Sequence, residues 1–256
     1  MESRRSCTLN FVKRIWAFLF QGRRSRRRAW VEDPADPRDH ILHPDGTVRQ
    51  GHAVLGTLTL PDPRAIPRRF NIVERGAARI RNHKPYNACT AFAIATLVDT
   101  MSLVDLNLNE HANLVGSSRR HRDASPLFLY TMGKKRRGFS GDATLFLRDV
   151  IQVAVKLGLP PETECPFDMK NFGDESPSAS AAMLASENKA TNYFRLDSPN
   201  IEPADLLVLI KRHIASGFPL AFGLIPVEIL EEKSGVAKHG KLTIPNGRFR
   251  RTSDCL

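Results

Sequence analysis

The residue of this 256-residue sequence best suited to covalent chemistry is Cys89. It follows Asn87, a residue type that caps helices, and apolar side chains then recur at helical spacing as far as Met101. This pattern predicts a buried helix over residues 88–101 with Cys89 in its first turn. The unpaired backbone N–H groups and the dipole of a helix start stabilise a thiolate, which is the nucleophilic form of cysteine.

A cysteine at this position has a second interpretation, because a small thiol is also a common packing residue in protein cores. The other cysteines, Cys7, Cys165 and Cys255, form neither a Cys-x-x-Cys pair nor a cluster at zinc-ligand spacing. We therefore expect no structural metal site, no disulfide framework and no cofactor.

The positive charge of the chain is concentrated at its beginning. The net charge is +11, of which residues 1–29 carry +8 and the remainder +3. A basic N-terminal tail over residues 1–30, with a short apolar stretch, is suited to an anionic membrane or another acidic partner. The apolar run over residues 15–20 is too short for a membrane span or a signal peptide, so we expect neither.

Differences in composition along the chain divide it into four segments. After the basic tail, residues 31–69 are rich in proline and aspartate, and we expect an extended, turn-rich lead-in lying over a domain. Residues 70–247 carry the organised domain, and residues 248–256 form an arginine-rich, atypical end.

Helical patterns dominate the first part of this domain. Besides the helix over residues 88–101, periodicity and end signals predict helices from Pro126 through Tyr130, over residues 142–157 and from Pro203 to Gly217. An apolar run over residues 218–227 then predicts a buried strand. Helices that precede strands favour an α+β fold over an alternating α/β fold.

The segment around Cys89 resembles a known active-site motif. Residues 80–93 are Ile-Arg-Asn-His-Lys-Pro-Tyr-Asn-Ala-Cys-Thr-Ala-Phe-Ala. This segment is similar to the papain-family sequence in which Val-Arg-(Asp/Asn)-Gln-Gly precedes a Cys that opens a (Trp/Thr)-Ala-Phe-Ala helix. Weaker matches follow in the same order at residues 125–130, 165–168 and 217–223. The chain thus resembles papain-like cysteine peptidases of the C1 type, especially bacterial members.

This resemblance implies a two-lobed α+β fold and a peptide or protein substrate. Cys89 would be the nucleophile that forms an acyl-enzyme, assisted by an imidazole and an asparagine from the other lobe. The Cys89 backbone N–H and the side chain at position 83 would hold the oxyanion, and Gly141 would take part in substrate binding.

The sequence departs from the family at two places. His83 stands where the family has its oxyanion glutamine, so it is either a weakened donor or a loop residue in a drifted site. The Gly-Gly-His-Ala-Val strand that supplies the catalytic histidine is not found after residues 218–227, which leads us to expect a complete helical lobe, an incomplete β lobe and a truncated site without its histidine. The sequence leaves open whether such a site is active. Residues 51–56, before Cys89, resemble this strand and have two interpretations: a permuted arrangement in which His52 pairs with Cys89, and a coincidence, which we favour. His213, on a helix face, is expected to be solvated, and His239 lies in a loop.

Two functions therefore remain open at this stage. One is a papain-like cysteine peptidase or its remnant. The other is a non-catalytic protein of the same fold, anchored by its basic tail to a membrane or nucleic acid. Tyr86 stands where secreted relatives often carry a disulfide cysteine, which favours a reducing, cytoplasmic location.

Overall fold

The computed structural model describes residues 32–76, 78–83, 85–111, 123–168 and 176–223. Residues 33–221 fall in one compact unit. In chain order its elements are β1 (Ile41–Leu42), β2 (Thr47–Gln50), β3 (Ala53–Thr57), the short 3-10 helices η1 (Pro63–Ala65) and η2 (Ile72–Arg75), α2 (Cys89–His111), α3 (Pro126–Arg137), α4 (Leu147–Lys156), α5 (Ala179–Glu187) and α6 (Pro203–Ala215). No helix of the described part is long and apolar enough to span a membrane.

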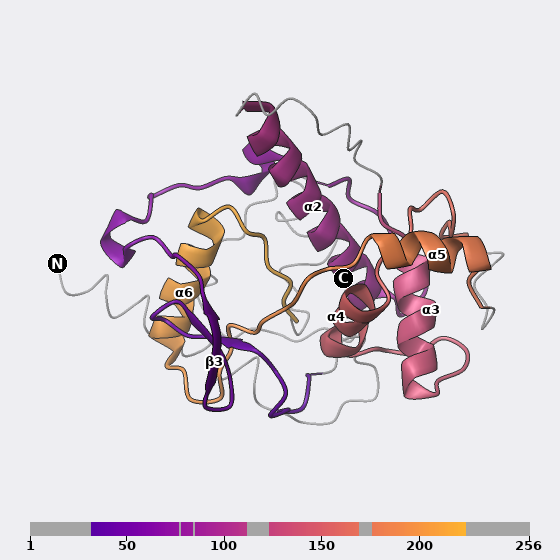
Figure 1. The fold of residues 1–256 in the computed structure, drawn as a ribbon, viewed down its shortest axis with the longest axis horizontal. Helices are drawn as coiled ribbons and strands as arrows, with labels where there is room; N and C mark the ends of the chain where they lie inside the picture. Colours follow the sequence, from indigo (N-terminus) through magenta and orange to yellow (C-terminus); the bar gives the residue numbers. More distant parts are fainter. Residues whose placement is uncertain (1–31, 77, 84, 112–122, 169–175, 224–256) are drawn as a thin grey trace, which may run out of the picture. The chain divides into compact units, whose positions relative to one another are not determined.

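The larger hydrophobic core is formed by helices α2 to α5, and Figure 1 shows α3 and α4 side by side near the beginning of α2. Its members come mainly from the buried faces of these helices, with Ile94, Phe128, Leu145, Val150 and Ala185 among them. The predicted helix 88–101 is confirmed as a buried element, but α2 begins one residue later and extends to His111. Cys89 is thus the first residue of the helix.

Helix α3 begins where its sequence predicts but runs to Arg137, seven residues beyond the predicted end at Tyr130. The hydroxyl of Ser125 accepts a hydrogen bond from the Phe128 N–H at 3.1 Å, and Pro126 occupies the first turn. The helix ends at Gly138, which has a φ of 66°, a left-handed conformation that glycine adopts without steric cost.

Helix α4 is shorter than predicted at its beginning. Residues 142–146 lie in a loop because their polar groups bond elsewhere: the Ala143 N–H donates to the Tyr130 hydroxyl at 2.7 Å, and Asp142 accepts from Asn87. At the other end, Gly158 has a φ of 90°, and a Cβ there would lie 1.8 Å from the Ala185 carbonyl oxygen. This close approach brings the end of α4 against α5, which the sequence analysis did not predict.

The lead-in contains more structure than expected. Strands β1, β2 and β3 form an antiparallel sheet in that order, with Arg49 opposite Val54. A two-residue turn, Gly51–His52, joins β2 to β3. Buried Leu42 and Val48 pack against Leu209 of α6, forming a second, smaller core. The strands were missed because they are short and carry few alternating apolar residues.

A buried carboxylate attaches the lead-in to the helices. Asp39 is 4% exposed and accepts from the Arg148 guanidinium at 2.6 and 2.9 Å, and from Arg195 at 3.1 Å. The backbone continues this attachment, because the Leu42 N–H donates to the Arg195 carbonyl at 2.8 Å. Segments more than 100 residues apart in sequence are therefore held together by one side chain.

The end of the described chain departs from prediction. Helix α6 is confirmed, and its end at Gly217 has a φ of 91°. Residues 218–223 are not a strand in the structure, and residues 224–227 lie outside the described part. The expectation that His213 is solvated is wrong: its ring is 5% exposed and lies between Phe194 and Phe218, at centroid distances of 5.7 and 5.6 Å.

Removing the Asp39 carboxylate should destabilise the protein strongly. Asp39→Ala leaves Arg148 and Arg195 partly buried without their shared counter-charge, and we expect the free energy of unfolding to fall by about 3 kcal/mol in urea titration. Asp36→Ala is the matched control, because its partner Arg38 has a side chain 81% exposed and such pairs contribute little. Equal losses in the two variants would contradict the anchoring role of Asp39.

Stability should fall in acid partly through His213. Burial lowers the pKa of His213 below its usual 6.5, and the neighbouring Pro219 carbonyl opposes this shift only in part. The unfolded chain therefore binds the proton more readily, so this contribution is present above about pH 6.5 and is lost as the pH falls below it.

His213→Gln removes the ionisable imidazole. The free energy of unfolding of this variant should decline less between pH 6.5 and 5 than that of the parent. Burial raises the pKa values of Asp33, Asp149 and Glu162, and these groups add to the stability of the folded state as the pH falls. The contribution of His213 has the opposite sign, so only the difference between the parent and the variant isolates it. Parallel pH profiles would show that His213 does not contribute.

Candidate active site

Cys89 lies at the start of a helix whose surroundings are apolar. Ala88, which precedes it, and Ala91, which follows in the first turn, are fully buried, whereas Cys89 itself is half-buried. The Phe92 N–H donates to the Ala88 carbonyl at 3.1 Å, so the helical hydrogen bonds begin immediately before the thiol. This placement gives the Cys89 side chain the positive end of the α2 dipole together with partial access to solvent.

The loop before Cys89 is anchored by Arg81, whose side chain is 7% exposed. Its guanidinium forms ion pairs with Asp99 of α2 at 2.9 Å and with Glu162 at 3.0 Å, and it donates to the Ala124 carbonyl at 2.8 Å. Burial raises the pKa of Glu162, against the effect of Arg81. The loop is therefore tied to the middle of the helix whose beginning carries Cys89.

His83 is held by the same loop. Its Nδ1 lies 2.8 Å from the Tyr86 carbonyl oxygen, and its ring contacts Phe92 at a centroid distance of 5.9 Å. Phe92 lies three residues after Cys89, so both occupy one face of α2. The structure thus places the His83 ring beside the first turn of the helix.

The hydrogen bond to Tyr86 has a chemical consequence. A carbonyl oxygen only accepts, so Nδ1 carries the hydrogen and Nε2 of the neutral ring carries a lone pair. In this orientation a neutral His83 has no second N–H to offer an oxyanion, whereas a glutamine amide always has one. At the position where the family resemblance implies an oxyanion donor, the ring therefore has a second N–H only when it is protonated.

Asp142 reaches the start of α2 from the loop before α4. One carboxylate oxygen accepts the Asn87 backbone N–H at 2.9 Å, and the other accepts the Asn87 side-chain amide at 2.8 Å. The expectation that Asn87 caps α2 is therefore wrong, because Ala88 occupies the capping position and the Asn87 amide is directed to Asp142.

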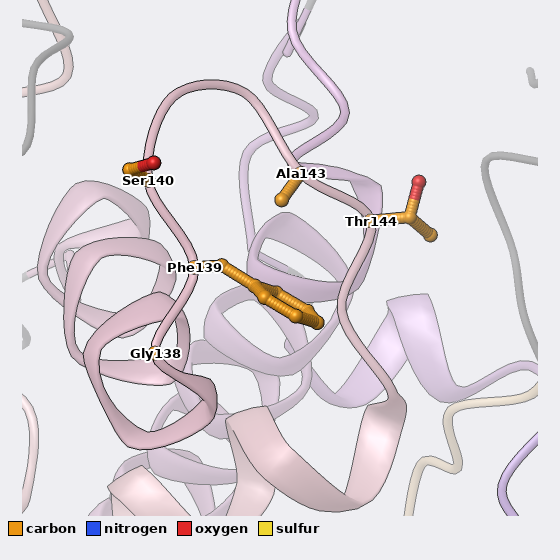
Figure 2. Close-up of a pocket in the computed structure, with 5 residues that line it drawn as sticks. All are labelled: Gly138, Phe139, Ser140, Ala143 and Thr144. Atoms are coloured by element: carbon orange, nitrogen blue, oxygen red, sulfur yellow. The ribbon is translucent and has the colours of Figure 1, made fainter.

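Gly141 lies in this same loop with a φ of 67°, and the ammonium of buried Lys134 donates to its carbonyl at 2.8 Å. A pocket beside it is lined by Gly138, Phe139, Ser140, Ala143 and Thr144. Figure 2 shows the ring of Phe139 and the side chain of Ala143 projecting into the interior of the loop, while Ser140 and Thr144 point away. The role of Gly141 in substrate binding stays a prediction.

The other histidines lie elsewhere. His52 is exposed in the turn between β2, which contributes Val48 to the smaller core, and β3, whereas Cys89 begins a helix of the larger core. His213 is buried in the smaller core region, and His239 lies outside the described residues. Among the described side chains, no three His, Cys, Asp or Glu residues gather closely enough to hold a metal ion.

Sequence reasoning missed the groups that orient the site. Asp99 is the one charged residue of the predicted helix 88–101, which is a signal for a buried partner, and Arg81 stands in the quoted motif as a basic residue ahead of the cysteine. Asp142 gave no comparable signal, because its contact with Asn87 spans 55 residues.

Comparison with known proteins supports the fold. No family model matches this sequence. No curated protein matches it either. Among solved structures, xylellain, a cysteine protease from Xylella fastidiosa, is similar with a TM-score of 0.53 and 22% identity, over 77% of this chain and 67% of that chain. At this identity the likeness concerns the fold alone, and it supports a papain-like fold, here of helices with a small antiparallel sheet. The C1-type assignment, the lobe boundaries and the site roles stay predictions.

Replacing His83 with glutamine should preserve or raise the acylation rate of Cys89, by up to about 100-fold if an oxyanion donor is restored. The rate is measured with a peptidyl electrophile at pH 7.5. His52→Gln is the matched control and should leave the rate unchanged. A large loss in His83→Gln alone would mean that His83 has a role of its own.

Proposed function

We propose that this chain is a papain-like cysteine peptidase in which Cys89 attacks the carbonyl carbon of a peptide bond. The observation that carries the proposal is the position of Cys89 as the first residue of a 23-residue helix whose first turns are packed into the larger core, in a fold similar to that of a cysteine protease. In the described sequence motif, this is also the position that the family resemblance assigns to the nucleophile.

The chemistry follows from that position. The Cys89 thiol loses its proton, and the thiolate forms a bond to the carbonyl carbon while the carbonyl oxygen takes the negative charge. When the carbon–nitrogen bond breaks, the leaving amine takes up a proton and an acyl-enzyme remains. Water then adds to the thioester, and release of the carboxylic acid restores the thiol. The N–H groups of the first turn of α2 favour both the thiolate and the oxyanion.

Cys165 provides an internal comparison. It packs against the larger core, and burial raises the pKa of its thiol, with a hydrogen bond from Ser125 acting in the opposite direction. A thiol with a raised pKa is a poor nucleophile at neutral pH. The proposal requires the other half-buried cysteine, Cys89, to ionise more readily than Cys165, as its place at a helix start favours.

The test is labelling of the full chain with a peptidyl electrophile at pH 7, with peptide mapping by mass spectrometry. We expect modification of Cys89 at a rate at least about tenfold above that of Cys165 and above that of a simple thiol, since the helix start favours the thiolate. Cys89→Ala should abolish this labelling and any peptide hydrolysis, whereas Cys165→Ser should preserve both.

Equal labelling of all cysteines would overturn the peptidase proposal and favour a non-catalytic protein that uses the fold for binding. That alternative makes its own prediction, which is loss of salt-sensitive binding to anionic vesicles or nucleic acid after deletion of residues 1–29. Under the peptidase proposal the same deletion leaves peptide cleavage unchanged.

A further inference from the structure

The start of α2 is held from outside the helix. Asn87 lies two residues before Cys89, and both its backbone N–H and its side-chain amide donate to the Asp142 carboxylate, at 2.9 and 2.8 Å. Two hydrogen bonds from one residue to both oxygens of a carboxylate fix the orientation of that residue. Since Ala88 is fully buried, little freedom is left between Asn87 and the thiol.

Asp142 is itself held in place by helix α3. The Tyr130 hydroxyl donates to Asp142 at 2.6 Å and lies 2.9 Å from the Ala143 carbonyl oxygen. The Lys134 ammonium donates to the Gly141 carbonyl and lies 5.0 Å from the centroid of the Tyr130 ring. Tyr130 and Lys134 are buried, so a rigid part of the larger core determines where the carboxylate sits.

The charge of Asp142 does not help a thiolate. A carboxylate near a thiol disfavours its ionised form, because the two negative charges repel each other. If the group had only an electrostatic effect at Cys89, it would therefore oppose the proposed chemistry. Its hydrogen bonds act in the other direction, because they keep the first turn of α2 formed, and with it the N–H groups that stabilise the thiolate.

We propose that Asp142 is a positioning residue of the Cys89 site, acting through Asn87 to keep the start of α2 and its thiol in place. This inference deepens the proposed function and rests on it. Asp142 acts through its hydrogen bonds to Asn87, and their effect on the start of α2 outweighs the repulsion between its carboxylate and the Cys89 thiolate. Asp142 belongs to the loop that also lines the pocket, and through Asn87 it links that loop to the segment that carries the nucleophile.

Two substitutions separate geometry from charge. Asp142→Asn removes the charge and keeps an oxygen that accepts from the Asn87 backbone, whereas Asp142→Ala removes both. Iodoacetamide alkylation of Cys89 across pH 6–10, followed by peptide mapping, gives the pH midpoint of thiol ionisation. His83 and the Arg81, Asp99 and Glu162 side chains are unchanged in both variants, so differences between them arise at position 142.

We expect the Asp142→Asn midpoint to lie below that of the parent, because the repelling charge is gone. The Asp142→Ala midpoint should lie above that of Asp142→Asn by about half a pH unit, because fraying of the first turn removes part of the helix-dipole stabilisation. Labelling by a peptidyl electrophile, relative to iodoacetamide, should fall about tenfold in Asp142→Ala and much less in Asp142→Asn.

Identical midpoints and labelling ratios in the two Asp142 variants would overturn the inference. Asn87→Ala provides a second test if Asp142→Ala folds poorly: it should reproduce part of the loss, and a variant indistinguishable from the parent contradicts the inference. Asp45→Ala, which removes a carboxylate bonded to Thr47 in the distant sheet, is the control and should change neither readout. Failure of the parent to prefer the peptidyl electrophile would count against the proposed function alone, because the alkylation midpoints still test Asp142.

Discussion

The buried ion pair between Arg81 and Asp99 is the interaction on which the arrangement of the site depends. It joins the loop before Cys89 to the middle of α2, at 2.9 Å and with both side chains almost inaccessible to water. Charges in such surroundings are stable only when they are paired, so the loop has one position that satisfies both groups. His83, Asn87 and Cys89 all follow within eight residues of this fixed point, and Asp142 holds the other end of the segment.

A comparable interaction organises the smaller core. Asp39 pairs with Arg148 and Arg195, and Arg212 of α6 donates to the carbonyls of Pro61 and Leu60. The lead-in is therefore bonded to the helices through side chains as well as through its sheet. Both cores use a buried charge to join segments far apart in sequence, which local apolar patterns alone do not specify.

The helices were largely predictable because their signals are local. Ser125 and Pro126 begin α3 where the sequence indicates, Gly158 and Gly217 follow the ends of α4 and α6, and the apolar period locates α2. The errors occur where distant groups compete for the same backbone. Tyr130 and Asn87 form hydrogen bonds with residues 142–143, so α4 begins later than predicted. The short lead-in strands pack against α6 and residues 194–201, which lie far away in the sequence.

The sequence by itself determined that Cys89 opens a buried helix, because the helical period of apolar residues is a property of neighbouring positions. It also determined the resemblance that names the class of chemistry. Only the tertiary structure decided what surrounds the thiol: the Tyr86 carbonyl that fixes the His83 ring, and the Asp142 carboxylate that holds Asn87. Tertiary structure also placed His213 in the interior, where the local sequence suggested solvent. These contacts depend on how the chain folds back on itself, which periodicity along the sequence does not encode.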